Sequence, residues 1–136
     1  MHYSLLYYTY RQGEKKMKID TAVYFSDISA VRDCLSRGEK CGLHEAIRQG
    51  DLSIIKLLIA SGSDINKRNL LGYTPLHVAC LNDDVEVVRY LLDIGADIRI
   101  KTAAGFSSIV LSEISGCTLV SEFFSDCLGR LFSFGV

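Results

Sequence analysis

The stretch GYTPLHVAC, residues 72–80, contains the only proline of the chain, directly after a threonine. This order predicts the start of a helix. Thr74 can act as the N-cap, because its hydroxyl accepts a hydrogen bond from a free N–H of the first turn. Pro75 suits the first helical position, where the missing N–H costs nothing and φ is already set. Gly72 suits a turn with positive φ just before the helix.

A second helix is predicted a few residues downstream. Apolar side chains recur there with i, i+3 and i+4 spacing, which places them on one helical face. They are Val85, Val87, Val88, Leu91 and Leu92. Gly95 follows at the end of this helix, where a left-handed conformation is needed. Two helices this short cannot bury their own apolar face, so the pair must pack against neighbours.

The sequence repeats itself with a period of 33 residues. A shift by this period superimposes identical residues at glycine, capping and core positions. The matches are Leu43 on Leu76, His44 on His77, Ala46 on Ala79, Asp51 on Asp84, Leu58 on Leu91, Gly62 on Gly95, Asp64 on Asp97 and Ile65 on Ile98. A fixed period in this range is typical of a repeat array.

The stretch NLLGYTPLHVACLNDDVEVVRYLLDIGADI, residues 69–98, resembles an ankyrin repeat over its full length, with TPLH-x-A, VV-x-x-LL and G-A-D-I in place. Residues 42–66 resemble a second copy, in which Cys-Gly replaces Thr-Pro. Residues 102–134 resemble a degraded third copy. Upstream, SDISAVRDCLSRG, residues 26–38, resembles the second half of another unit.

The resemblance implies an all-α fold, an ankyrin-type solenoid of helix-turn-helix repeats with short hairpin loops. Gly38 stands only 24 residues before Gly62, so part of the usual spacing is missing from the leading unit. The order of the N-terminal segment, residues 1–20, is left open. We predict an array over residues 21–128, with a partial unit at 26–38, further units at about 39–68, 69–101 and 102–128, and a C-terminal tail at 129–136.

The resemblance also implies a structural role for the histidines. In ankyrin repeats this histidine ties the threonine side chain to the adjacent backbone, so we expect His77 to do this with Thr74. The second copy has only Cys41 at the place of the threonine, which leaves the bonding of His44 open. A general base or metal ligand is the functional alternative. The predicted structural residues are Thr74, Pro75, His77, His44, Gly72 and Gly95.

Composition and charge exclude several other classes of protein. Of the 136 residues, 49% are hydrophobic, which excludes a disordered chain. A net charge of −1 gives no reason to expect nucleic acid as a partner. No apolar run approaches the ~20 residues of a membrane span, and the first residues do not form a convincing signal peptide. We therefore expect a chain that binds neither nucleic acid nor membranes. We also expect a monomer.

The five cysteines are odd in number and no export signal accompanies them, which indicates reduced thiols and a cytoplasmic or nuclear location. They lack the C-x₂-C pairs typical of zinc sites, so we predict no metal site. The sequence has no Gly-rich phosphate loop, no G-x-S-x-G and no H-E-x-x-H. We therefore predict no catalytic residue and no cofactor.

Ankyrin-like arrays generally bind other proteins through the hairpin tips and the concave face of the inner helices. The resemblance thus implies an adaptor, an inhibitor or a targeting subunit. The residues at these positions are Arg48, Gln49, Arg68, Leu70, Leu71, Tyr73, Leu81, Asn82, Lys101, Ala103, Ala104 and Phe106. Several are large and apolar at places that the fold should leave exposed, and an exposed apolar patch suggests a partner. Alternatively, Leu70 and Leu71 pack against a neighbouring hairpin or the N-terminal segment.

The segment KKMKIDTAVYFSD, residues 15–27, supports a second hypothesis. It loosely resembles the docking motif of type-1 protein phosphatase regulators, which binds a sheet edge as an extended strand with its Val and Phe in pockets. Here these are Val23 and Phe25. Basic residues normally adjoin the valine, whereas Lys18 stands five places away. Alternatively, Val23 and Phe25 cover the end of the first helices.

The C-terminal segment, residues 117–136, is predicted to be helical to about Cys127 and to cap the last unit. An apolar face with i, i+4 spacing supports this; it contains Leu119, Val120, Phe123, Phe124 and Cys127. Thr118 and Leu119 could instead begin an elongin-binding box that recruits a ubiquitin ligase, but Phe123 stands where its cysteine belongs. Residues 134–136 are a candidate C-terminal ligand for a PDZ-type groove.

Overall fold

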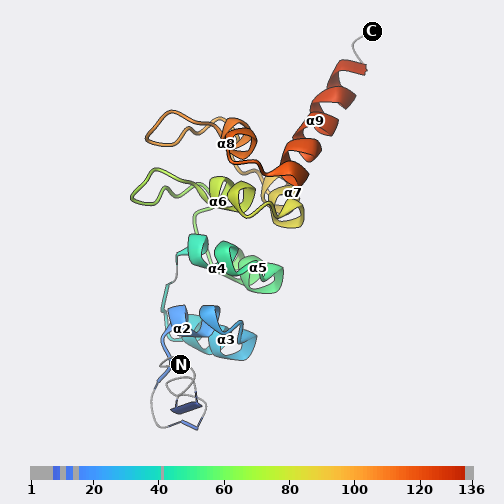
Figure 1. Cartoon of the computed structure of the whole chain (residues 1–136). Helices are drawn as coiled ribbons and strands as arrows, with labels where there is room; N and C mark the ends of the chain where they lie inside the picture. Colours follow the sequence, from blue (N-terminus) through green and yellow to red (C-terminus); the bar gives the residue numbers. More distant parts are fainter. Residues whose placement is uncertain (1–7, 10–11, 14–15, 41, 134–136) are drawn as a thin grey trace. The chain divides into compact units, whose positions relative to one another are not determined.

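The structure, a computed structural model, describes residues 8–9, 12–13, 16–40 and 42–133 (Figure 1). The regular secondary structure of these residues is entirely helical. The helices are α2 (Ile19–Tyr24), α3 (Ile28–Ser36), α4 (Leu43–Gln49), α5 (Leu52–Ala60), α6 (Pro75–Leu81), α7 (Val85–Asp93), α8 (Ser108–Ile114) and α9 (Thr118–Ser133). They form consecutive helix-turn-helix pairs, so the predicted all-α fold is confirmed.

The helix pairs follow the period of the sequence. We call the first helix of each pair the inner helix and the second the outer helix. The outer helices α5, α7 and α9 begin at residues 52, 85 and 118, which are 33 residues apart. Leu43 in α4 and Leu76 in α6 occupy equivalent places, and both are buried. The sequence repeat is therefore a repeat of helix pairs.

The turn inside each pair contains one residue with positive φ. These residues are Ser26 (52°), Gly50 (75°), Asp83 (55°) and Gly116 (72°). Glycine adopts this conformation without steric cost, whereas a residue with a Cβ is strained there. Asp83 adopts this strained conformation and also caps a distant helix.

Aspartate side chains cap the N-termini of the outer helices. In three pairs the cap is the residue directly before the helix: Asp27 for α3, Asp51 for α5 and Asp84 for α7. Helix α9 is capped from a distant turn instead. Asp83 Oδ1 accepts from the N–H of Val120 at 2.8 Å, and Oδ2 accepts from the N–H of Leu119 at 3.3 Å. The turn between α6 and α7 thus anchors the start of α9.

The helices belong to two compact units, residues 1–64 with α2 to α5 and residues 65–136 with α6 to α9. We call them the N-terminal unit and the C-terminal unit. In the N-terminal unit, α2 packs against α3 and α4, and α5 packs against α3 and α4. In the C-terminal unit, α6 packs against α7 and α8, and α9 packs against α7 and α8. Each pair therefore buries its apolar face against another pair of its own unit.

Aliphatic side chains fill the core of both units. The largest fully buried ones are Val23, Val31, Ile47, Ile54, Ile55 and Leu58 in the N-terminal unit, and Leu76, Val87, Val88, Leu91 and Val120 in the C-terminal unit. Free thiols complete the core at Cys34, Cys80 and Cys117. Burial raises the pKa of Cys80 to about 12, so this thiol stays protonated and packs as a small apolar group.

The leading pair has both of its helices. The boundary predicted from the sequence starts this unit at residue 26, and the structure has the inner helix α2 directly before it. The connection from α3 to α4, residues 37–42, is shorter than the connections at 61–74 and 94–107. The short spacing noted in the sequence therefore reflects a short connection between pairs, not an absent helix.

The predicted end segments are only partly described. Residues 1–7, 10–11 and 14–15 of the N-terminal segment lie outside the described residues, as do Cys41 and the proposed PDZ ligand at 134–136. Helix α9 continues to Ser133, beyond the predicted start of the tail at 129. Within the part of the chain that the structure describes, every helix is too short or too polar to cross a membrane.

Candidate binding surface

The hairpin before α6 is built around one asparagine. Asn69 donates its N–H to the carbonyl of Tyr73 at 2.9 Å, and its own carbonyl accepts from the N–H of Gly72 at 2.9 Å. The Asn69 side-chain oxygen accepts from the N–H groups of Leu71 and Tyr73, both at 3.0 Å. These bonds satisfy the backbone of the turn internally, so the tip keeps a defined shape.

The hairpin before α8 repeats this design with a threonine. Thr102 donates its N–H to the carbonyl of Phe106 at 2.8 Å, and its carbonyl accepts from the N–H of Gly105 at 2.9 Å. The Thr102 hydroxyl accepts from the N–H of Phe106 at 3.1 Å. We call residues 69–73 and 102–106 together the hairpin pair.

The two hairpins touch each other through their backbones. The N–H of Ala103 donates to the carbonyl of Leu71 at 3.4 Å. Gly72 has φ of +79°, and a Cβ added there would lie 2.7 Å from the nitrogen of Ala103. Only glycine therefore permits both the turn and the close approach of the second hairpin.

A buried histidine joins α6 to the second hairpin. The Thr74 hydroxyl accepts from the N–H of His77 at 3.4 Å, and His77 Nδ1 accepts from the N–H of Thr74 at 3.1 Å, forming a capping box. Because Nδ1 accepts, Nε2 carries the ring proton and donates to the carbonyl of Phe106 at 3.1 Å. His77 is completely buried, and Pro75 occupies the first position of α6.

Burial sets the protonation state of His77. Desolvation lowers its pKa, and the nearby positive charge of Arg68 acts in the same direction, while the hydrogen bond to Phe106 opposes them. The ring is therefore held neutral. A neutral ring with both nitrogens occupied in the fold is a structural element, not a free base.

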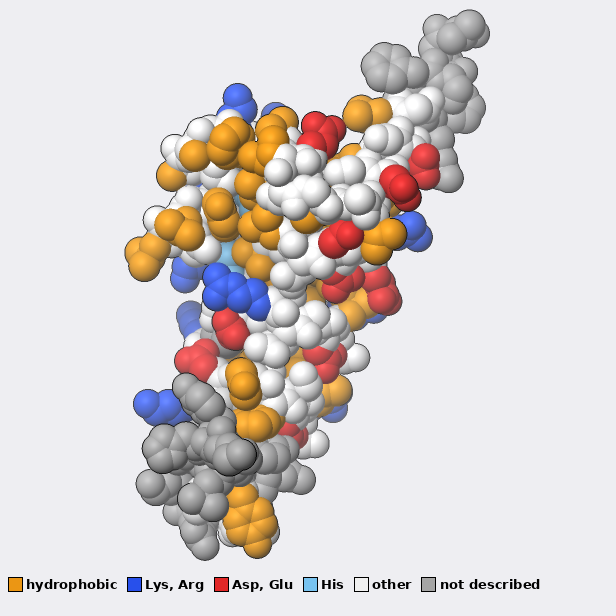
Figure 2. All heavy atoms as spheres, viewed as in Figure 1, with side chains coloured by type: hydrophobic (Ala, Val, Ile, Leu, Met, Phe, Trp, Pro, Cys, Tyr) orange, Lys and Arg blue, Asp and Glu red, His pale blue; other side chains and the backbone are white. Residues whose placement is uncertain are grey.

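The predicted binding residues of the C-terminal unit are largely exposed. Leu70 is 104% exposed, as in a freely solvated chain, and Leu71 is 64% exposed. Phe106 is exposed to 38%. The side chains of Tyr73 and Leu81 are half-buried, and those of Arg68, Asn82, Lys101, Ala103 and Ala104 are exposed. Figure 2 shows hydrophobic side chains gathered over the two hairpins that precede α6 and α8.

Tyr73 has a packing role as well as partial exposure. Its ring stacks on the imidazole of His77, with the ring centroids 6.0 Å apart. A substitution at Tyr73 would therefore disturb the buried histidine as well as the surface.

The predicted residues of the N-terminal unit lie on α4. Arg48 and Gln49 are exposed, and both contact Glu45 on the same helix. The N-cap of α4 is Gly42, which offers no side-chain cap, and His44 behind it is half-buried. The helix ends at Gly50, whose left-handed conformation closes the turn to α5.

Basic residues beside the hairpin pair are a feature that sequence reasoning missed. Lys67 and Arg99 are exposed, next to the predicted Arg68 and Lys101. Arg99 pairs with Asp97, with Nε at 3.1 Å from Oδ1 and Nη2 at 3.2 Å from Oδ2. Hydrogen bonds from Arg99 hold the pKa of the Asp97 carboxyl below its usual range. The sequence does contain a signal for these basic residues, because Lys or Arg recurs near each hairpin.

The alternative docking segments adopt helical structure. Val23 lies on α2 and is fully buried, and Phe25 is half-buried with its ring edge-on to Tyr24 at 5.0 Å. Thr118 and Leu119, the start of the proposed elongin-binding box, are exposed at the beginning of α9.

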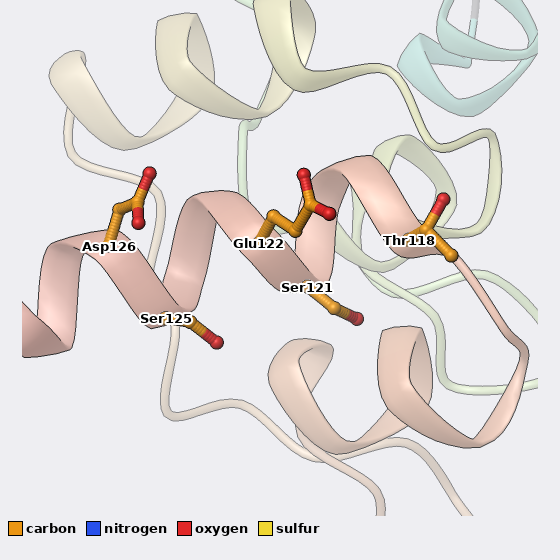
Figure 3. A pocket seen from close by; sticks show the side chains of 5 residues that line it. All are labelled: Thr118, Ser121, Glu122, Ser125 and Asp126. Atoms are coloured by element: carbon orange, nitrogen blue, oxygen red, sulfur yellow. The ribbon is translucent and has the colours of Figure 1, made fainter.

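A shallow hollow follows one polar face of α9. It is lined by Thr118, Ser121, Glu122, Ser125 and Asp126 (Figure 3). All five side chains come from a single helix, and the hollow is open to solvent. Among the described residues, no cluster of three or more His, Cys, Asp or Glu side chains could hold a metal ion.

Paired short helices, hairpins between the pairs and a capping box closed by a buried histidine define an ankyrin repeat protein. The family profile described as "Ankyrin repeats (3 copies)" matches residues 19–117. The chain therefore belongs to the ankyrin repeat family.

Individual relatives match only part of the chain. Protein phosphatase 1 regulatory subunit 27 of Homo sapiens and that of Mus musculus are each 33% identical over 93 residues, covering 52% of this chain and 60% of the relative. Ankyrin repeat domain-containing protein OPG023 of Cowpox virus is 37% identical over 75 residues, covering 48% of this chain and 11% of the relative. This chain thus matches less than two thirds of the length of these relatives.

Proposed function

We propose that this chain is a non-catalytic adaptor, inhibitor or targeting subunit that docks on a partner protein through the hairpin pair. The observation that supports this most directly is the exposure of Leu70 and Leu71 at the tip of the first hairpin. Exposed leucines on one hairpin and an exposed phenylalanine on the hairpin that contacts it form the kind of apolar patch that a partner covers. Ankyrin repeat proteins typically bind other proteins, which agrees with this role.

The rigidity of the hairpin pair favours binding. The first tip is held by Asn69, the second by Thr102, and the contact between Leu71 and Ala103 joins them. Binding costs conformational entropy when a loop must be ordered, and a loop with an internally bonded backbone has less entropy to lose. The hairpin pair therefore presents its apolar side chains in advance of contact.

Inner-helix residues extend the proposed surface within each unit. In the C-terminal unit, Leu81 and Asn82 at the end of α6 are half-buried and exposed, respectively. In the N-terminal unit, the exposed Arg48 and Gln49 offer polar contacts. We assign these positions a supporting role, because a few central apolar residues usually dominate binding energy.

The test is cross-linking mass spectrometry of the tagged protein in cells, with wild type compared with Leu70→Ser/Leu71→Ser. We expect the double variant to lose the cross-linked partner while its circular dichroism stays unchanged, because both side chains are exposed. Leu128→Ser is the matched control, since Leu128 is also an exposed aliphatic residue of the same unit, at 44%, and lies on the outer helix α9. Full retention of the partner by the double variant would contradict the proposal.

Regulation of a type-1 protein phosphatase is a second candidate function. The similarity to Protein phosphatase 1 regulatory subunit 27 supports it. The geometry of the proposed motif does not, because Val23 is buried on α2. Docking as an extended strand would require α2 to unfold.

Binding of the purified phosphatase catalytic subunit distinguishes the two surfaces. If Val23 to Phe25 form the docking motif, Phe25→Ala abolishes binding while Leu70→Ser/Leu71→Ser leaves it intact. If the hairpin pair is used, the opposite result is expected. Absence of any binding by the wild-type protein would eliminate this candidate.

A further inference from the structure

The surroundings of the hairpin pair are strongly basic. Residues 65–73 and 96–106 contain one acidic side chain, Asp97, and it is occupied by the ion pair with Arg99. Three other cations remain on this part of the surface: Lys67, Arg68 and Lys101. All three are exposed, and none of them forms an ion pair with a described residue.

The rest of the C-terminal unit has the opposite charge. Its acidic residues outside the hairpins are Asp83, Asp84, Glu86, Asp93, Glu113, Glu122 and Asp126, against Arg89 and Arg130. The near-zero net charge of the whole chain therefore conceals a separation of charge within this unit. Separated charge of this kind steers a partner by its field and fixes the orientation of the encounter.

Apolar tips and basic flanks together restrict the chemistry of the partner. We infer that the hairpin pair docks on an acidic protein surface, whose apolar residues cover Leu70 and Leu71 and whose carboxylates face Lys67, Arg68 and Lys101. This inference rests on the proposed function. A nucleic acid would satisfy the cations but offers no aliphatic residues to cover the two leucines. A basic or neutral partner would leave the cations desolvated without compensation.

The probe for this inference is a phage-displayed library of random peptides. The library is selected on the immobilised full chain and depleted on Leu70→Ser/Leu71→Ser, so that the surviving peptides depend on the hairpin tip. We expect these peptides to combine aliphatic or aromatic residues with an excess of Asp and Glu over Lys and Arg. Each selected peptide is then synthesised in two forms, one native and one with Asn and Gln replacing Asp and Glu.

Charge variants of the protein complete the test. We expect the amide form of the peptide, and the variant Lys67→Glu/Arg68→Glu, each to lower affinity about tenfold. The native interaction should also weaken as salt is raised, because exposed charges are screened. Arg32→Glu/Lys40→Glu is the matched control, since it changes the net charge equally through exposed residues of the N-terminal unit. This control should bind the peptide like wild type.

Each outcome decides between the inference and its alternatives. Hairpin-dependent peptides without an acidic excess, or with equal affinity in the amide form, would overturn the inference and leave the proposed function standing. A library that yields no hairpin-dependent peptide would overturn both. Equal or tighter binding of a mixed-sequence single-stranded oligonucleotide would assign the surface to nucleic acid. A dimer in sedimentation that Leu70→Ser/Leu71→Ser abolishes would assign it to a second copy of this chain.

Discussion

The connection between α3 and α4 and the connection between α7 and α8 join equivalent helix pairs in different ways. Residues 94–107 form a hairpin tied to α6 by His77, whereas residues 37–42 are too few for such a hairpin. In the short connection, Glu39 accepts from the N–H of Ile19 at 2.9 Å and pairs with Arg37 at 2.6 Å. The helix pairs are thus compatible with either connection, and α3 and α4 are joined without the long hairpin.

This difference separates what stabilises the pairs from what presents a binding surface. Helix pairs of both units bury aliphatic side chains and cap their outer helices with aspartate. Among the residues that the structure describes, only those of the C-terminal unit combine hairpins with exposed leucines, and only there does a buried histidine reach from an inner helix to the next hairpin. The hairpins therefore need their own stabilising contacts, such as the bonds of His77 to Thr74 and Phe106.

The largest effect is expected from His77→Ala. His77 is completely buried, so its loss leaves a cavity and removes the hydrogen bonds at Thr74 and Phe106, which should lower the free energy of unfolding by about 3 kcal/mol. His44→Ala should cost about 1 kcal/mol, because His44 is only half-buried. Urea unfolding followed by circular dichroism measures both. Equal losses of unfolding free energy in the two variants would show that the two histidines contribute equally. The C-terminal unit would then not differ from the N-terminal unit in this respect.

A smaller loss of stability is expected from replacing glycine by alanine at two positions. The two glycines have the same backbone conformation, but only one of them lies against another part of the chain. Gly72 and Gly38 have φ of +79° and +82°, but only at Gly72 would a Cβ meet another atom, the nitrogen of Ala103 at 2.7 Å. Gly38→Ala should therefore cost about 1 kcal/mol from φ alone. Gly72→Ala should cost about 2 kcal/mol, because the clash adds to the same strain.

The measurement is again the urea midpoint, together with hydrogen exchange at the N–H of Ala103. Exchange there should accelerate in Gly72→Ala and stay unchanged in Gly38→Ala, since the contact with Leu71 is lost only in the first variant. Equal destabilisation by the two substitutions would mean that the second hairpin can move away from residue 72 without loss of stability.

The third prediction concerns the distant cap of α9. Asp83→Gly removes the acceptor for the N–H groups of Leu119 and Val120 but relieves the strain of its positive φ. Loss of the cap should dominate, with a net cost of about 1 kcal/mol. Asp83→Asn should be milder, because asparagine tolerates this φ and can still accept one bond. Faster hydrogen exchange in the first turn of α9 measures the loss of the cap. If Asp83→Gly were more stable than wild type, the cap would contribute less to stability than the strain at Asp83 costs.

Local features together with the sequence repeat were enough to predict most of the helix pairs. Apolar spacing indicated α7, Thr74 with Pro75 indicated the start of α6, and the 33-residue repeat extended this pair to α4 and α5. Helix α2 has only six residues, too few for a helical period to stand out. The cap from Asp83 to α9 joins residues far apart in sequence, so no local pattern contains it. Exposure of the hairpin leucines also depends on the packing of the whole unit, and their partner depends on surface chemistry that the fold leaves free.

The smallest effect follows from the pH dependence of stability. Burial lowers the pKa of His77 in the folded chain below its ordinary value of 6.5, so the unfolded chain binds a proton more readily. Stability from the neutral ring is therefore fully present above pH 6.5 and is lost as the pH falls from 6.5 toward the lowered folded pKa. Unfolding free energies at pH 7.5 and 5.5, with NMR titration of the imidazole signals, measure this change. Titration of His77 above 6.5 would show that the hydrogen bond to the Phe106 carbonyl outweighs burial in setting the pKa of the ring. The buried link between α6 and the second hairpin would then strengthen in acid.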